Sequence, residues 1–132
     1  MDTLALRLRP HADLKKSLDA FAREHHLPAA CIVTCVGSLR QASLRFANQP
    51  HAALIEGKFE IVSLVGAFSE HGGHYHISIS DAQGQTLGGH LMDGCLIYTT
   101  AEIVIGALHK VKFVRELDNE TGFKELVIRE NG

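Results

Sequence analysis

The stretch of sequence that decides the fold reads GHYHISISD (residues 73–81), AQGQ (82–85) and TLGGHL (86–91). Side chains alternate between the two faces of a β-strand, so His74 and His76 point the same way. A turn at Gln83-Gly84 brings His90 back beside them. The sequence therefore predicts a β-hairpin with three histidines close together.

Three imidazoles that converge from a sheet are typical of an open metal site. Zinc takes about four ligands, so three nitrogens leave one position for water or substrate. The alternative is structural, because a single histidine in a strand is usually a surface residue or a hydrogen-bonded core residue. Two histidines at positions i and i+2 and a third on the same hairpin favour the metal site, with His74, His76 and His90 as ligands.

The residues around these histidines have expected roles of their own. Gly88 and Gly89 lack a Cβ, so backbone or another subunit can approach closely there, or a bulge can aim His90 at the pair. A simple turn after the strand is the alternative. Tyr75 and Ile77 point away from the histidines and are expected in the core or in an interface.

Several polar residues could assist such a site. His71 precedes two glycines and could supply a fourth ligand, although a loop histidine is more often solvated. Glu102 could orient a ligand histidine or act as a general acid or base, and an exposed edge charge is the alternative. Glu56 and Glu60 carry the same alternatives. Asp81 lies on the other face and is expected to cap the hairpin turn.

The N-terminal part of the chain predicts one strand and one helix. Residues 4–9 alternate between apolar and polar, and Pro10 ends the run. Residues 11–26 have a helical period with Asp13 as a plausible N-cap or first-turn acid. One face of this helix is apolar and carries Leu14, Leu18, Phe21 and Ala22.

The rest of the chain predicts short strands. Residues 30–36 are continuously apolar and β-branched, which favours a central strand covered on both faces and ended by Gly37-Ser38. Because nearly all connections are short, we expect an α+β fold: a mostly antiparallel sheet with one main N-terminal helix, in a compact single domain. The other expected strands are 41–46, 58–66, 94–99, 102–108, and 111–116 paired with 124–129 across a turn at 118–122.

The bulk composition is that of an ordinary globular chain. A length of 132 residues fits one domain. No signal peptide is recognised, and no apolar stretch approaches the ~20 residues of a membrane helix, so we expect a cytoplasmic protein without membrane contact. Cys31, Cys35 and Cys95 are odd in number and are expected to be reduced thiols.

The charge distribution gives little support for nucleic-acid binding. The net charge is −2, whereas a domain that binds nucleic acid by itself usually shows a basic stripe. The least dispersed cationic group is Lys110, Lys112 and Arg115, and this spacing is more typical of a solvated strand face. The sequence also contains no phosphate-binding glycine loop and no nucleophile motif.

Together these motifs resemble a known family. The segments EGKFEIVSLVG (56–66), GHYHISISD (73–81) and GGHLMDGC (88–95) are similar to the plants-and-prokaryotes-conserved (PPC) domain. The N-terminal strand and helix also fit, so the resemblance spans the whole chain and implies a single PPC domain over residues 1–132. The combination HxH…GGHL carries most of the specificity.

The resemblance implies an antiparallel α/β fold, assembly as a homotrimer, and a metal, zinc, at His74, His76 and His90 near a subunit boundary. In plants this domain follows AT-hooks that contact the minor groove of A·T-rich DNA. The present sequence contains no Arg-Gly-Arg-Pro hook. The fold is also similar to acetolactate decarboxylase, a metal enzyme with three histidine ligands.

Three functional hypotheses follow, in decreasing order. The first is a homotrimeric zinc-binding regulatory or assembly module that acts with DNA or with DNA-binding partners. The second is a metal-dependent enzyme, a lyase or hydrolase, that acts on a small polar substrate. The third is direct DNA binding through a ring of Lys110, Lys112 and Arg115 from three chains. No catalytic residue and no organic cofactor is assigned.

Overall fold

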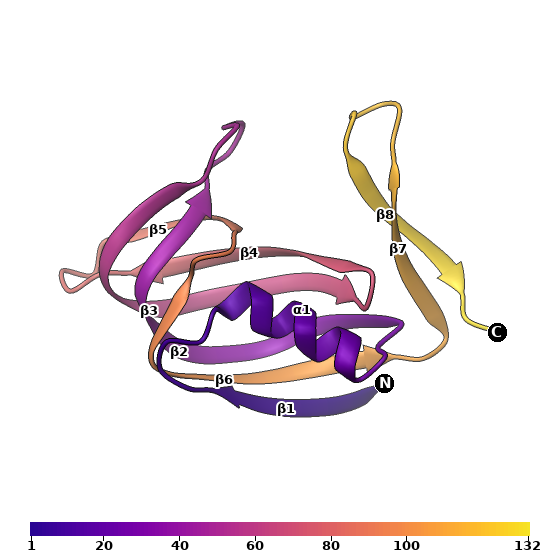
Figure 1. Cartoon of the computed structure of the whole chain (residues 1–132), viewed down its shortest axis with the longest axis horizontal. Helices are drawn as coiled ribbons and strands as arrows, with labels where there is room; N and C mark the ends of the chain where they lie inside the picture. The colour runs from indigo at the N-terminus through magenta and orange to yellow at the C-terminus, as the bar shows by residue number, and fades with distance from the viewer.

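The computed structural model describes all 132 residues and contains one helix and eight strands. Strands β1 to β6 form one sheet, and β7 and β8 form a separate two-stranded sheet that rises from it (Figure 1). Every pairing is antiparallel, which confirms the α+β prediction. The elements are β1 (Asp2–Leu8), α1 (Leu14–Glu24), β2 (Ala29–Arg45), β3 (Ala53–Ser69), β4 (Gly72–Ser80), β5 (Thr86–Leu91), β6 (Leu96–Leu108), β7 (Val111–Leu117) and β8 (Lys124–Glu130).

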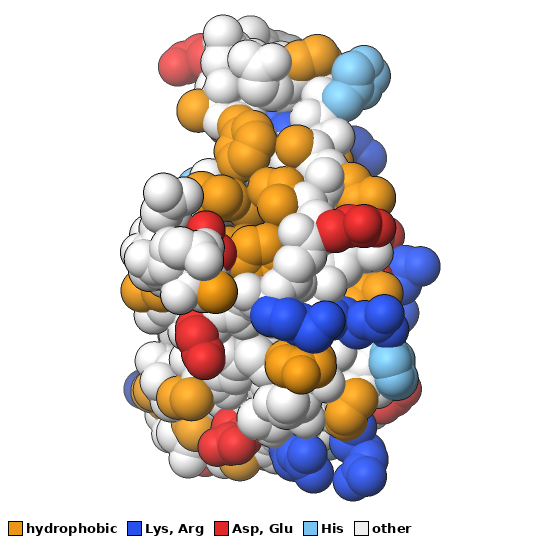
Figure 2. Space-filling model, turned by 90° about the vertical axis from the view of Figure 1, so that its left-hand side faces the viewer, with side chains coloured by type: hydrophobic (Ala, Val, Ile, Leu, Met, Phe, Trp, Pro, Cys, Tyr) orange, Lys and Arg blue, Asp and Glu red, His pale blue; other side chains and the backbone are white.

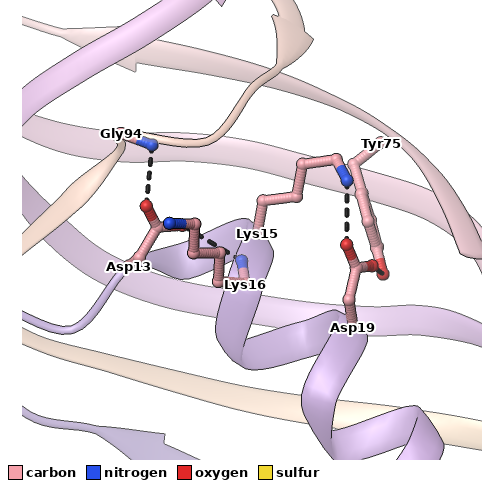
Figure 3. Close-up of polar contacts among 6 residues, drawn as sticks. All are labelled: Asp13, Lys15, Lys16, Asp19, Tyr75 and Gly94. Carbon is pink, nitrogen blue, oxygen red and sulfur yellow. Dashed lines mark hydrogen bonds and ion pairs between the residues drawn. The ribbon is translucent and has the colours of Figure 1, made fainter.

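Helix α1 begins where the sequence predicts. The Asp13 carboxylate accepts a hydrogen bond from the Lys16 backbone N–H at 3.0 Å and another from the Gly94 N–H at 2.7 Å (Figure 3). The first is an ordinary N-cap bond, and the second fixes the helix start to the segment before β6. Leu14 and Leu18 are fully buried against the sheet, so the predicted apolar face is confirmed.

The large sheet has the strand order β1-β6-β2-β3-β4-β5. The last strand, β5, also pairs with the end of β2, where Leu44 faces Leu91 and Arg45 faces His90. This second pairing closes β2, β3, β4 and β5 into a ring at one end of the sheet. It brings residues that lie 45 and 47 positions apart in sequence into direct register.

Three strands are longer than the sequence predicts. Strand β3 (Ala53–Ser69) extends beyond the expected 58–66 at both ends. Gly37-Ser38 does not end a strand, because β2 continues through it, and β6 likewise continues through Thr100 and Ala101. The predictions of breaks at both places were wrong. A Cβ added at Gly37 would lie 2.3 Å from the Thr100 carbonyl oxygen, so this glycine permits close contact between the two strands instead of ending one.

The prediction that residues 30–36 are covered on both faces was also wrong for the single chain. Helix α1 covers only the inner face of the sheet (Figure 1). On the outer face, the side chains of Val33 and Val36 are 51% and 63% exposed. A run of apolar residues in a strand therefore indicates burial on both faces only when a second layer is present.

The core lies between α1 and the inner face of the sheet. Cys95 is fully buried there and its thiol donates to the Ser43 carbonyl, while burial raises the pKa of Cys95 to about 11. Burial also raises the pKa of Cys35 to about 11. All three cysteines are free thiols, as predicted. No helix is long and apolar enough to cross a membrane.

The C-terminal hairpin, β7 and β8, was predicted correctly but has no core of its own. None of its residues is buried. Three hydrogen bonds hold β7. Ser69 Oγ of β3 donates to the Phe113 carbonyl, Arg115 donates to the Ala67 carbonyl of β3, and the Phe113 N–H donates to the carbonyl of Pro28, just before β2. The hairpin is thus positioned by polar contacts near its start.

Candidate metal centre

The structure brings together the three histidines that the sequence singled out. Their ring centroids lie 4.9 Å apart for His74 and His76, 5.4 Å for His74 and His90, and 4.5 Å for His76 and His90. One ring nitrogen from each lies within 4.8 Å of the other two. His74 and His76 are exposed and His90 is half-buried, so the cluster opens at the surface.

The hairpin register explains this convergence. His76 and His90 are directly opposite each other across β4 and β5, and His74 lies two residues before His76 on the same face. The turn is capped as expected, because the Asp81 carboxylate accepts hydrogen bonds from the Gln83 and Gln85 backbone N–H groups, each at 2.9 Å. The histidines therefore project from paired strands with a fixed register.

The two glycines before His90 allow close backbone approach, as predicted. A Cβ added at Gly88 would lie 2.6 Å from the Ile77 carbonyl oxygen, and one at Gly89 would lie 2.8 Å from the Arg45 carbonyl oxygen. Both distances are too short for real side chains. Strand β5 can therefore pack tightly against β4 on one side and β2 on the other. This packing places His90 opposite His76.

Tyr75 anchors β4 between its two histidines. Its side chain is buried, and its hydroxyl donates to the Asp19 carboxylate of α1 at 2.9 Å, while Lys15 donates to the other oxygen of that carboxylate at 2.8 Å (Figure 3). Gly66 and Gly73 leave space for the ring, because an added Cβ would lie about 2.5 Å from Tyr75 atoms at each position. The expectation that Tyr75 and Ile77 face the core is confirmed.

The chemistry of the three rings suits a divalent metal. Partial burial, with the nearby charges of His76 and Arg115, lowers the pKa of His74. Partial burial and Arg45 likewise lower the pKa of His90. Neutral imidazole is the form that binds metal. Tetrahedral zinc places its ligand nitrogens about 3.4 Å apart, so small side-chain rotations would bring these nitrogens to that spacing.

A hollow of about 740 Å³ lies beside the histidines and is lined mostly by polar side chains. Strand β2 contributes Arg45, β7 contributes Arg115, and β8 contributes Lys124 and Glu125. Sequence reasoning did not assign any of these residues to the histidine site. Arg45 reaches the site through the pairing of β2 with β5, and the β8 residues reach it through the docking of the C-terminal hairpin; neither arrangement has a local sequence signal.

The other candidate residues lie outside the cluster of three rings. His71 lines the hollow but is not among the three clustered rings. Glu102 lies on β6, separated from β4 by β2 and β3, and accepts a hydrogen bond from Thr100. Glu60 is paired with Ser80 and Glu56 with Gln41, both toward the other end of β3. In one chain, none of the three glutamates contacts the histidines.

Comparison with known proteins finds a matching family and similar sequences. The sequence profile of the Plants and Prokaryotes Conserved (PCC) domain, the family abbreviated PPC above, matches residues 1–109. A bifunctional protein GlmU from a Synechococcus strain is 48% identical over 123 residues, which cover 93% of this chain. The chain spans about a fifth of the length of the curated relatives it matches.

Solved structures share the whole fold. A hypothetical protein from Salmonella enterica has a TM-score of 0.97 at 40% identity, covering 99% of this chain and 95% of its own. A metal-containing protein from Archaeoglobus fulgidus has a TM-score of 0.81 at 25% identity, and the match covers 96% of this chain and 94% of that protein. A candidate DNA-binding protein from Bacteroides thetaiotaomicron has a TM-score of 0.83 at 22% identity, and the match covers 95% of this chain and 91% of that protein.

The expected relation to acetolactate decarboxylase is visible at the level of the fold. A Staphylococcus aureus protein described as similar to that enzyme has a TM-score of 0.50 at 17% identity, covering 80% of this chain and 52% of its own. At that identity the likeness concerns the fold alone.

Proposed function

Because this chain belongs to the Plants and Prokaryotes Conserved (PCC) domain family, we propose that it is a zinc-binding module that works as a homotrimer. His74, His76 and His90 are the proposed zinc ligands. The observation that carries the proposal is the clustering of three imidazole nitrogens within 4.8 Å on strands held from the core side by Tyr75. The relative described as metal-containing supports it.

The choice of zinc rests on the ligand set. Three neutral imidazoles without a thiolate or carboxylate suit zinc among the borderline metals, and three protein ligands leave the fourth position for water or a bound molecule. That position would face the hollow described above. The site is therefore of the open kind, in contrast to the closed four-ligand kind that only stabilises a fold.

Self-association is supported by the uncovered outer face of the sheet, and the number of three subunits is what the family resemblance implies. Val33, Val36, Val62 and Val65 are each more than half exposed there. Exposed apolar faces of this kind mark association surfaces, and identical subunits usually associate with closed cyclic symmetry. Val65 is the register partner of His76, so the proposed subunit boundary runs beside the proposed metal site.

A regulatory or assembly role is our first interpretation of this module. The relatives from Synechococcus support it, because a domain similar to this chain forms about a fifth of a longer protein there. Such a domain can serve as an attached oligomerisation unit. Three free thiols fit the reducing environment of the cytoplasm, where we place the protein.

A second candidate, a metal-dependent lyase or hydrolase that acts on a small polar substrate, is favoured by the open hollow beside the histidines. The metal would polarise a carbonyl group or activate water there. The chain's own contribution would be three ligands on fixed strands and several cationic side chains around the substrate.

Direct DNA binding ranks third. Similar structures are described as candidate DNA-binding proteins, but this chain carries a net charge of −2. Lysine and arginine side chains lie among acidic and hydrophobic ones on the face shown in Figure 2. Arg115, one of the three residues proposed for a basic ring, lines the hollow and donates to the Ala67 carbonyl.

The decisive experiment combines metal titration with a mass measurement. Protein prepared without a nickel column and stripped with EDTA is titrated with zinc by calorimetry, and its mass is measured by sedimentation equilibrium. We expect one zinc per chain and three times the chain mass of 14.4 kDa. Absence of zinc binding would overturn the metal site, and a monomeric mass would overturn the trimer.

A further inference from the structure

Three cations that have no acidic partner surround the hollow beside the histidines. They are Arg45 of β2, Arg115 of β7 and Lys124 of β8. The ion pairs of the chain join other residues: Lys15 with Asp19, His109 with Asp2, and Arg129 with Glu116. Lys15 also lines the hollow, and its charge is balanced by Asp19. Glu125 is the one carboxylate that lines the hollow, so the three unpaired cations against one anion leave two positive charges uncompensated.

Each arginine is placed next to one of the clustered histidines. Arg45 is the register partner of His90, and its Nη1 donates to the Gln49 carbonyl at 3.3 Å. Arg115 donates through Nη2 to the carbonyl of Ala67 at 3.4 Å, and Ala67 is the register partner of His74. Each arginine is held by one hydrogen bond. Because a guanidinium has five N–H donors, most of the donors of each arginine stay free.

A bound anion would relieve the repulsion among these cations. Like charges gathered around one hollow repel each other, and proteins usually pair such groups with carboxylates. Free guanidinium donors match carboxylate and phosphate oxygens, which they hold with two parallel hydrogen bonds. The lining contains a single hydrophobic residue, Phe123, which argues against an apolar ligand.

We propose that this hollow binds a small organic anion whose carboxylate or phosphate group is held by Arg45 and Arg115. The volume of about 740 Å³ is within the usual range for small-molecule sites. The inference deepens the proposed function. It rests on the proposed zinc site in one respect, namely that the anion would lie across the open side of the histidine cluster, next to the metal. It assigns the substrate or effector of that site to the class of oxyanions.

The inference can be tested on the metal-free full chain, so that it does not depend on zinc. Inorganic phosphate and malonate are titrated separately by calorimetry at low ionic strength. We expect at least one of them to bind with a Kd below about 10 mM, and the stronger of the two identifies the preferred oxyanion. Arg115→Gln and Arg45→Gln should each weaken binding by about tenfold.

Lys112→Gln is the matched control, because it removes the same charge from the same strand but does not line the hollow. It should change the affinity less than twofold. Arg115→Lys serves as a second variant that keeps the charge while losing the planar fork, and it should bind more weakly than the unaltered chain. Circular dichroism checks that all variants fold.

The outcomes separate this inference from the metal proposal. Anion binding without zinc binding would overturn the metal site and leave the anion site standing. Zinc binding with no affinity for either anion would overturn the anion site alone. Equal affinity in Arg115→Gln, Arg45→Gln and Lys112→Gln would also overturn it, because the anion would then be held by general surface charge.

Discussion

The two hairpins that meet at the hollow differ in how they are held. In β4, Tyr75, Ile77 and Ile79 are all at most 3% exposed, and β5 adds the buried Leu91. In β7 and β8 no residue is buried. The first hairpin is part of the six-stranded sheet, and the second forms a sheet of its own.

This difference divides the site into two parts. The buried hairpin carries the three histidines, so the proposed metal ligands stand on a backbone fixed by the core. The exposed hairpin carries Arg115, Lys124 and Glu125, which face the same hollow from strands tied down by a few polar contacts. The proposed metal ligands thus stand on the buried hairpin, whereas the proposed anion contacts are shared with a hairpin that has no buried residue.

Hydrogen exchange gives the largest expected contrast between the hairpins. Backbone amides of β4 that pair with β3 should exchange about 1,000-fold more slowly than those of β7 and β8, because only global unfolding opens the former. Mass spectrometry of peptides from residues 72–80 and 111–130 measures this. Similar protection in both segments would mean that the C-terminal hairpin is held far more firmly than its contacts indicate.

A matched pair of substitutions tests the same contrast energetically. Ile79 is fully buried in β4, whereas Ile128 of β8 is 61% exposed. Ile79→Ala should lower the free energy of unfolding by about 3 kcal/mol, and Ile128→Ala by less than about 1 kcal/mol. Urea denaturation of both variants provides the measurement, and equal losses would contradict the comparison.

Removing one histidine should weaken zinc binding without unfolding the chain. His76 is exposed, so His76→Ala deletes a proposed ligand at little cost to packing. We expect its zinc affinity to fall by about 100-fold or more. His71→Ala is the control, because His71 lines the hollow but lies outside the cluster. A comparable loss in the control would show that the ligand set is assigned wrongly.

The smallest effect concerns the anchor of β4. Tyr75→Phe removes the hydroxyl that donates to Asp19, and we expect a loss of about 1.5 kcal/mol in the free energy of unfolding. Tyr98→Phe is the matched control: the Tyr98 side chain is 44% exposed, and no hydrogen bond of its hydroxyl is present. Thermal unfolding of both variants is compared. If the stability of the Tyr75→Phe variant equals that of the unaltered chain, Tyr75 does not anchor β4 through its hydroxyl.

The sequence predicted the local features of the site well. The spacing of His74, His76 and His90, the turn capped by Asp81 and the glycines that admit β5 all follow from strand alternation and turn chemistry. Most of these interactions join residues near one another in the chain; the contact of Gly89 with the Arg45 carbonyl is the exception. The helix at Leu14–Glu24 was equally accessible, because its cap and its apolar period are local signals.

What the sequence could not predict depends on distant pairings. Gly37 resembles a strand terminator until β6 is seen to lie against it. The exposure of Val33 and Val36 depends on how many layers cover the sheet, which strand composition does not reveal. Arg45 becomes a site residue only through its register with His90, and nothing near Arg45 in sequence indicates that contact.

The central claim is that the three histidines bind zinc. The most direct test is the anomalous scattering of a crystal grown with zinc from protein purified without a nickel column. We predict a single strong peak per chain at the zinc edge, about 2.1 Å from one ring nitrogen of each of His74, His76 and His90. A map without a peak at this cluster, or with zinc bound by other residues, would contradict the account.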